Sequence, residues 1–155
     1  MHFSKILIAT DLSSASLAAF ELAAYEKKMQ GTEVILFYAH RLVEPFSLEG
    51  INYLEPALLR EYGEAHRDKA LAKLKEIAAR YFHGQEVRCE AQISHHAAGE
   101  EICAFAEQEH CDLLVMGSRG HTVLGSLFLG SVVQRVLLLA KCPVMIVPPT
   151  RKEKH

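Results

Sequence analysis

The chain has 155 residues, which is the length of one ordinary domain with a core of its own. Apolar residues make up 50% of it and charged residues 23%, so the composition excludes disorder for the bulk of the chain. The formal net charge of -2 excludes the chain-wide basic field that drives binding to nucleic acid. We expect one domain over residues 1–150, followed by a polar tail at residues 151–155.

The cysteines and the apolar runs bear on where the protein works. The four cysteines form no CxxC pair, and no signal peptide precedes the first apolar run, which is typical of a reduced, cytosolic chain. The longest apolar runs, residues 136–140 and 144–149, are far shorter than the roughly 18 residues that a membrane span needs. We therefore expect a cytoplasmic protein without a membrane span.

In the first third of the chain, apolar runs alternate with a helical pattern. Residues 5–10 and 34–39 are nearly continuous apolar runs, as in parallel strands that are covered on both faces. Between them, residues 13–14 are serines that can cap a helix, and Gly31 stands where that helix should stop. Residues 41–56 contain turn residues without a period and are expected to form a loop. The apolar positions at helical spacing are Ala18, Leu22, Tyr25 and Met29.

The rest of the chain repeats this alternation. A long amphipathic helix is expected at residues 57–82, closed by Gly84. Residues 87–94 alternate apolar and polar side chains, so this strand should expose one face and lie near a sheet edge. The remaining predicted elements are a helix around Ile102, Phe105 and Ala106, a strand at residues 113–116, a helix at residues 132–140 and a last strand at Val144–Val147.

Strands that alternate with helices at this spacing predict a single doubly wound α/β domain. We expect a Rossmann-like, five-stranded parallel sheet of strand order 3-2-1-4-5 with helices on both faces. In such a sheet a ligand lies beyond the carboxyl ends of the strands, where the strand order reverses, which here is between the first and fourth strands. The residues after Thr10 and after Met116 are therefore the candidate site.

Glycines are concentrated after the fourth predicted strand. Gly117, Gly120, Gly125 and Gly130 fall within fourteen residues. Glycine allows close backbone approach and positive φ, and Gly130 begins a helix whose free N–H groups favour an anion. A phosphate is the expected ligand, and a loop that only turns a corner is the alternative. The sequence has neither a GxGxxG fingerprint after the first strand nor the lysine of a P-loop.

The spacing Gly117-x2-Gly120-x9-Gly130-Ser131, together with Ala9-Thr10-Asp11, resembles the universal stress protein family in its ATP-binding branch. The resemblance covers essentially the whole chain. It implies an adenine nucleotide alpha hydrolase-like fold and a bound adenine nucleotide, which is ATP, ADP or AMP. Mg²⁺ on the phosphates is a further candidate.

The resemblance also implies roles for individual residues. Asp11 would contact the nucleoside, and the backbone of Ala39 would contact adenine. The pocket would be lined by Ala9, Thr10 and Met116. Ribose and phosphates would be held by Gly117, Gly120, Gly130, Ser131 and Val132. From the residues alone, Asp11 is either a ligand contact or a helix cap, and Arg119 is either a phosphate partner or an exposed loop residue.

Three functions are compatible with this pocket. The first is a stress-response regulator, in which nucleotide binding changes the states of the loop at residues 118–129 and of a dimer. The second is a slow ATP hydrolase, which is disfavoured because no general base is recognisable beside the glycine loop. The third is an interaction adaptor without nucleotide, which the intact glycine pattern disfavours. We assign no catalytic residue and no metal ligand, because the nine histidines show no ligand spacing.

The last strand is the expected site of self-association. The resemblance implies a homodimer through Val144–Val147. A further protein partner is also expected, and the sequence does not indicate its identity. The strand is short, apolar and at an expected sheet edge, whose unpaired backbone groups invite another chain. Proline at Met145 is expected to remove a backbone donor from that edge and to give a monomer.

Overall fold

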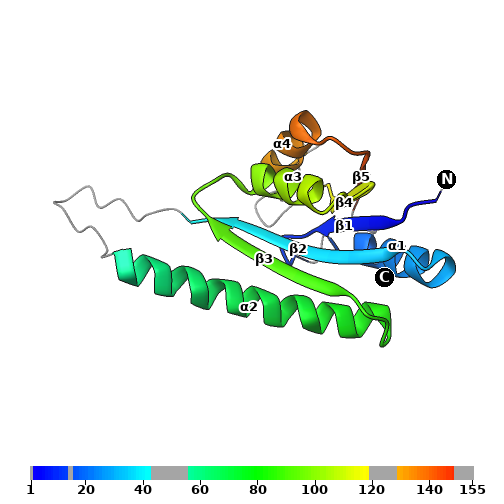
Figure 1. The fold of residues 1–155 in the computed structure, drawn as a ribbon, viewed down its shortest axis with the longest axis horizontal. Helices are drawn as coiled ribbons and strands as arrows, with labels where there is room; N and C mark the ends of the chain where they lie inside the picture. Colours follow the sequence, from blue (N-terminus) through cyan, green and yellow to red (C-terminus); the bar gives the residue numbers. More distant parts are fainter. Residues whose placement is uncertain (1, 14–15, 43–55, 119–128, 149–155) are drawn as a thin grey trace, which may run out of the picture.

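The computed structural model describes residues 2–13, 16–42, 56–118 and 129–148. A five-stranded parallel sheet lies at its centre, in the order β3-β2-β1-β4-β5 (Figure 1). The predicted strand order is confirmed. The strands are β1 (Lys5–Ala9), β2 (Glu33–Arg41), β3 (Arg88–Ser94), β4 (Leu113–Gly117) and β5 (Val144–Val147). Because β1 lies between β2 and β4, the strand order reverses at β1, as the sequence predicts.

Helices cover both faces of this sheet (Figure 1). Ile6 and Ile8 of β1 pack on one face with α1 (Leu17–Gln30) and α2 (Pro56–Phe82). Leu7 and Ala9 pack on the other face with α3 (Ala98–Gln108) and α4 (Ser131–Leu139). Successive side chains of a strand point to opposite faces, so a nearly continuous apolar run is buried on both. No helix among the described residues has the length and apolar character to span a membrane.

The helix ends and the edge strand agree with the sequence patterns. Gly31 and Gly84 follow α1 and α2 closely and have φ values of 69° and 81°, which glycine adopts readily. β3 is an outer strand of the sheet, as its alternating pattern predicts. Of the predicted loop at residues 41–56, Arg41 belongs to β2 and Pro56 to α2, and residues 43–55 lie outside the described residues.

The apolar positions at helical spacing on α1 do not all face the sheet, since only Ala18 and Leu22 among them are half-buried. Tyr25 and Met29 are 60% and 62% exposed, whereas the buried residues of this helix include Ala19, Phe20 and Ala23. α1 is apolar on several sides, so the spacing alone fits more than one face. The Phe20 ring decides the orientation, because it is fully buried against the sheet. The start is also later than residues 13–14 suggest, since α1 begins at Leu17.

Two glycines provide a matched test of the packing that holds α4 in place. A Cβ on Gly99, in the first turn of α3, would lie 2.8 Å from Cβ of Arg135 on α4, which is too close. A Cβ on Gly63, within α2, would meet only Cγ2 of Ile93 at 3.8 Å. We expect Gly99→Ala to lower the free energy of unfolding by about 1–3 kcal/mol. Gly63→Ala should raise it by about 0.5–1 kcal/mol, because alanine restricts the unfolded chain.

Urea denaturation followed by circular dichroism measures both effects. Equal midpoints for the two variants would contradict the close contact between α3 and α4 at Gly99.

Candidate functional site

The chain turns sharply after β1, and hydrogen bonds of Thr10 fix the turn. The Thr10 N–H donates to the carbonyl of Phe37 at 3.0 Å, and its Oγ1 accepts from the Leu12 N–H at 2.9 Å. Oγ1 also lies 2.8 Å from Oγ of Ser16. Because the Ser16 hydroxyl donates to the carbonyl of Ser13 at 2.8 Å, the Thr10 hydroxyl is the donor in that pair. Thr10 therefore ties the end of β1 to the start of α1.

Leu12 has a φ of 66°, a left-handed conformation that is uncommon for a leucine. The next residue is bound back to the turn, since Oδ1 of Asp11 accepts the Ser13 N–H at 3.0 Å. This bond lies in the turn and is not a helix cap, because the N-cap of α1 is Ser16. Strained backbone of this kind occurs at functional sites when the surrounding contacts enforce it, as those of Thr10 do here.

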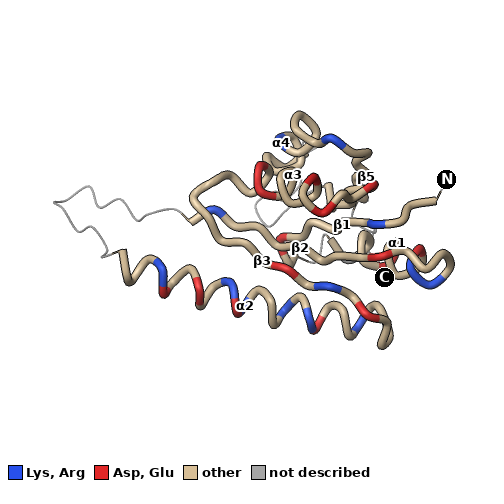
Figure 2. Tube along the Cα trace, viewed as in Figure 1, with Lys and Arg blue, Asp and Glu red and all other residues tan. Residues whose placement is uncertain are grey.

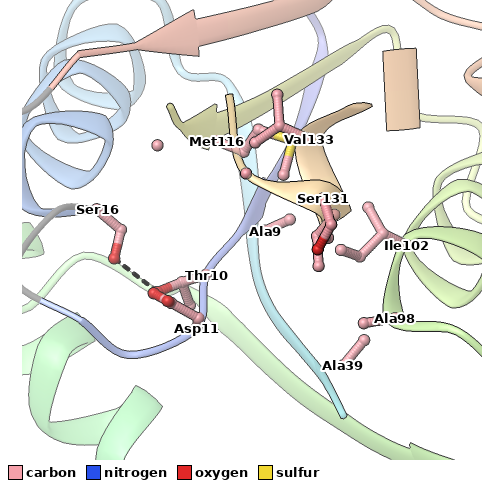
Figure 3. Close-up of a pocket in the computed structure, with 13 residues that line it drawn as sticks. Ala9, Thr10, Asp11, Ser16, Ala39, Ala98, Ile102, Met116, Ser131 and Val133 are labelled. Carbon is pink, nitrogen blue, oxygen red and sulfur yellow. Dashed lines mark hydrogen bonds between the residues drawn. The ribbon is translucent and has the colours of Figure 1, made fainter. Parts of the chain in front are cut away.

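A cavity of about 250 Å³ lies at the carboxyl ends of β1, β2 and β4 (Figure 3). Every predicted site residue within the described ranges lines it. These residues are Ala9, Thr10, Asp11, Ala39, Met116, Gly117, Gly130, Ser131 and Val132. The predictions for Arg119 and Gly120 fall outside the described residues. The strand ends and the start of α4 thus surround one space, at the position where a doubly wound sheet binds its ligand.

Four further residues line the cavity without having been predicted. They are Ser16, Ala98, Ile102 and Val133. Ala98 and Ile102 are one turn apart on α3, and Figure 3 shows them beside Ser131 and Ala39. In the sequence, Ser16 and the three apolar residues look the same as residues of an ordinary core. No pattern marks them as the wall of a cavity. Only the hydroxyl of Ser16 could have been noticed, as part of the serine cluster that precedes α1.

The start of α4 presents backbone donors to this cavity. The first bond along the helix runs from the Gln134 N–H to the carbonyl of Gly130 at 3.0 Å. The N–H groups of Ser131, Val132 and Val133 therefore precede the helical bonding pattern, and no acceptor among the described residues takes them. Together with the helix dipole they form a favourable place for an anion.

Gly130 fixes the position of these donors, though not in the way that the sequence suggests. Its φ of -61° and ψ of 150° are open to any residue, so the expectation of positive φ does not apply here. Its N–H donates to the carbonyl of Ser118 at 3.3 Å, and the Ser118 N–H donates to the carbonyl of Val147 at 3.0 Å. These two bonds join both ends of the glycine-rich segment to the sheet.

The charge of the cavity lining is simple. Among the described residues that line it, Asp11 is the only one with an ionisable side chain. No group of three or more His, Cys, Asp or Glu residues in the described part of the chain could hold a metal ion. The described lining therefore offers one carboxylate, hydroxyl groups, backbone donors and apolar walls.

Comparison with known proteins identifies the family. The model of the universal stress protein family matches residues 2–148. Universal stress protein MJ0531 of Methanocaldococcus jannaschii is 36% identical over 154 residues, which are 97% of this chain and 85% of the relative. The chain belongs to the universal stress protein family.

Solved structures share its fold. The structure of protein MJ0577, from the same organism, has a TM-score of 0.78 and 27% identity, covering 98% of this chain and all of that one. A universal stress protein in complex with cAMP has a TM-score of 0.60 at 21% identity, over 97% of this chain and 100% of that one. One from Archaeoglobus fulgidus in complex with dAMP has a TM-score of 0.51 at 18% identity, over 94% and 98%.

Proposed function

We propose that this protein binds an adenine nucleotide in the cavity at the ends of β1, β2 and β4, and acts as a cytoplasmic stress-response regulator. The observation that carries the proposal is the arrangement of the cavity. The N–H groups at the start of α4, which no acceptor among the described residues takes, can hold phosphate, and the Asp11 carboxylate on another part of the lining can accept hydrogen bonds from ribose hydroxyls. An adenine nucleotide carries both kinds of group.

The other predicted residues fit the same ligand. The base would contact the backbone of Ala39 and lie among apolar walls such as Met116 and Ile102. Gly117 and Gly130 would contact the ribose and phosphates, with Arg119 and Gly120 as further partners in the proposal. Mg²⁺ would be held mainly by the phosphates themselves. Related structures of the same fold with cAMP and with dAMP support an adenine ligand.

Binding without rapid turnover is the favoured mode. Hydrolysis needs a group that activates water, and the described lining offers no histidine, lysine or glutamate for this task. Its one carboxylate already accepts the Ser13 N–H. A slow ATP hydrolase therefore remains the second candidate, and an adaptor without nucleotide is the third.

Titration calorimetry with ATP, ADP and AMP in the presence of Mg²⁺ tests the proposal. We expect saturable binding with a stoichiometry of one nucleotide per chain, and release of phosphate from ATP at a rate close to that of buffer. Fast phosphate release that is lost in Asp11→Ala would favour the hydrolase. The absence of binding to all three nucleotides would favour the adaptor.

We further propose a homodimer that pairs through β5. β5 is an outer strand of the sheet, so one side of its backbone is not paired with any described strand. Exposed apolar side chains lie on β5 and on α4. They include Leu137 (48% exposed), Leu138 (80%), Leu139 (41%) and Met145 (38%).

The register of β5 corrects the expected effect of proline at Met145. The carbonyl of Val147 accepts from the Ser118 N–H, so Val147 faces β4. The N–H and C=O of one residue point to the same side of a strand, and the sides alternate. Met145 therefore also bonds to β4, and Val144 and Ile146 point to the open edge. Proline at Met145 would break the internal sheet, so it does not test the dimer.

In this proposal nucleotide binding and assembly are linked. Ser118 and Gly130 flank the part of the segment at residues 118–129 that lies outside the described residues. They are hydrogen-bonded to each other, and Ser118 is also bonded to Val147 at the end of β5. A ligand that binds one state of this segment better would favour that state, by no more than its differential affinity. A partner protein could then distinguish bound from free protein.

A further inference from the structure

A second cavity continues from the first. Its volume is about 880 Å³, and it lies between the carboxyl end of β2 and the middle of α2. Asp11, Ala39, Ala98 and Val132 line both cavities. The two spaces therefore meet over the end of β2, and a ligand in the first could extend into the second. We call the second cavity the α2 groove.

One wall of the α2 groove is made of flat rings. The rings of His40 on β2 and His66 on α2 stack with centroids 4.7 Å apart and an interplanar angle of 19°. The Tyr38 hydroxyl lies 2.9 Å from Nε2 of His66, and the two rings are 5.9 Å apart. Tyr62, at 61% exposure, does not line the groove, and its ring lies tilted against His66 with centroids 6.2 Å apart. Hydrogen bonding and stacking hold these rings in place, and stacked rings of this kind accept another planar group.

The lining of the α2 groove is charged, with three basic side chains and the two acidic side chains of Asp11 and Glu76. Arg41, Lys69 and Lys73 line it, and acidic and basic residues alternate along α2 (Figure 2). Lys73 pairs with Glu76 at 2.7 Å, but neither Arg41 nor Lys69 forms an ion pair with another described residue. Two cations beside a ring-lined wall favour a guest that is both aromatic and anionic.

The state of His66 agrees with this assignment. Burial, and then the charges of His40 and Lys69, lower the pKa of His66. The imidazole is therefore neutral near pH 7, and a neutral ring stacks without the cost of desolvating a charge. An anion beside Lys69 would partly cancel the positive charge of Lys69, which is one of the charges that lower the pKa of His66.

We propose that the α2 groove is a second subsite for the same ligand, and that it holds an anionic aromatic group joined to the ribose of an adenine nucleotide, as in a 3′–5′-linked dinucleotide. This inference rests on the proposed function, because it takes the first nucleoside to lie in the first cavity. Asp11 stands on the border of the two cavities and is the proposed ribose contact. A substituent on a ribose hydroxyl would therefore pass from Asp11 into the α2 groove. The second base would stack on the ring wall, and the linking phosphate would lie near Lys69.

Titration calorimetry with three probes tests the proposal on the intact protein. The probes are AMP, adenosine 3′,5′-bisphosphate and the linear dinucleotide 5′-phosphoadenylyl-(3′→5′)-adenosine. Stacking of one base strengthens binding about 5- to 150-fold, so we expect the dinucleotide to bind at least about 5-fold more tightly than AMP. The bisphosphate should lie between the two, because it carries the added charge without the second ring.

Variants locate the effect. Lys69→Ala and His66→Leu should each remove most of the dinucleotide's advantage and leave the affinity for AMP unchanged, since neither residue lines the first cavity. Lys75→Ala is the matched control, because Lys75 is an exposed lysine of the same helix that lines neither cavity.

The outcomes separate this proposal from the proposed function. Equal affinities for AMP and the dinucleotide, or an advantage that survives both groove variants, would overturn the second subsite while nucleotide binding stands. Failure of all three probes to bind would overturn the proposed function and the subsite with it.

Discussion

Ser131→Asp is expected to weaken the binding of ATP by about 100-fold or more while the fold stays intact. Ser131 is the first residue of α4 and lines the cavity beside the N–H groups of the first helical turn. A carboxylate there would occupy the donors and repel phosphate, and two like charges about 4 Å apart cost several kcal/mol in a partly buried site. The same carboxylate favours a helix start, so thermal stability should stay equal or rise slightly.

Ser131→Asn is the matched control, because asparagine has the size of aspartate without its charge. It should keep the affinity for ATP within a few-fold of the unmodified chain in calorimetric titration. If the Asp and Asn variants bind ATP equally well, the phosphates do not lie at the start of α4, and the proposed orientation of the ligand is wrong.

The second large effect is expected at the proposed dimer interface. Leu138 is 80% exposed in the single chain, so it contributes little to the core of its own subunit. We expect Leu138→Glu to weaken dimerisation by at least about 30-fold, since a charge would have to be buried against apolar side chains of the partner. Circular dichroism of the variant should be unchanged.

Sedimentation velocity across a range of protein concentrations measures this effect. Leu58→Glu on α2 is the control, because Leu58 is also an exposed leucine on a helix, at 51%, but lies away from β5. A dimer that resists Leu138→Glu, or that is broken equally by Leu58→Glu, would place the interface elsewhere.

The sequence predicts the sheet well, because burial on both faces leaves a plain pattern. β1 and β2 are strands that helices cover on both sides, so their apolar runs are nearly continuous and easy to recognise. β3 is an outer strand, and its alternation reports this position. Right-handed crossovers restrict the strand order without fixing it, because the orders 3-2-1-4-5 and 2-1-3-4-5 both satisfy them.

Orientation and local backbone are harder to predict. α1 is apolar on several sides, and only the packing of Phe20 decides which side is buried. Leu12 has positive φ because the bonds of Thr10 and Asp11 enforce it, and nothing in a leucine indicates such a conformation.

For the candidate site, the sequence predicts the residues at the strand ends and at the start of α4, because glycines and polar residues mark them. Ala98 and Ile102 of α3 line the same cavity, but they resemble core residues of any amphipathic helix. The α2 groove forms because His66 lies close to Tyr38 and His40. Both of these residues are far from His66 in the sequence. Only the packing of α2 against β2 brings them together.

The central claim is that the first cavity holds an adenine nucleotide. The most direct test is to denature freshly purified protein and to identify the released small molecules by mass spectrometry, with the ultraviolet spectrum of the native protein alongside. The account predicts an adenine nucleotide in near-stoichiometric amount, or an empty protein that binds added ATP with Mg²⁺ at one site. Protein that releases no nucleotide and also fails to bind ATP, ADP or AMP would contradict it.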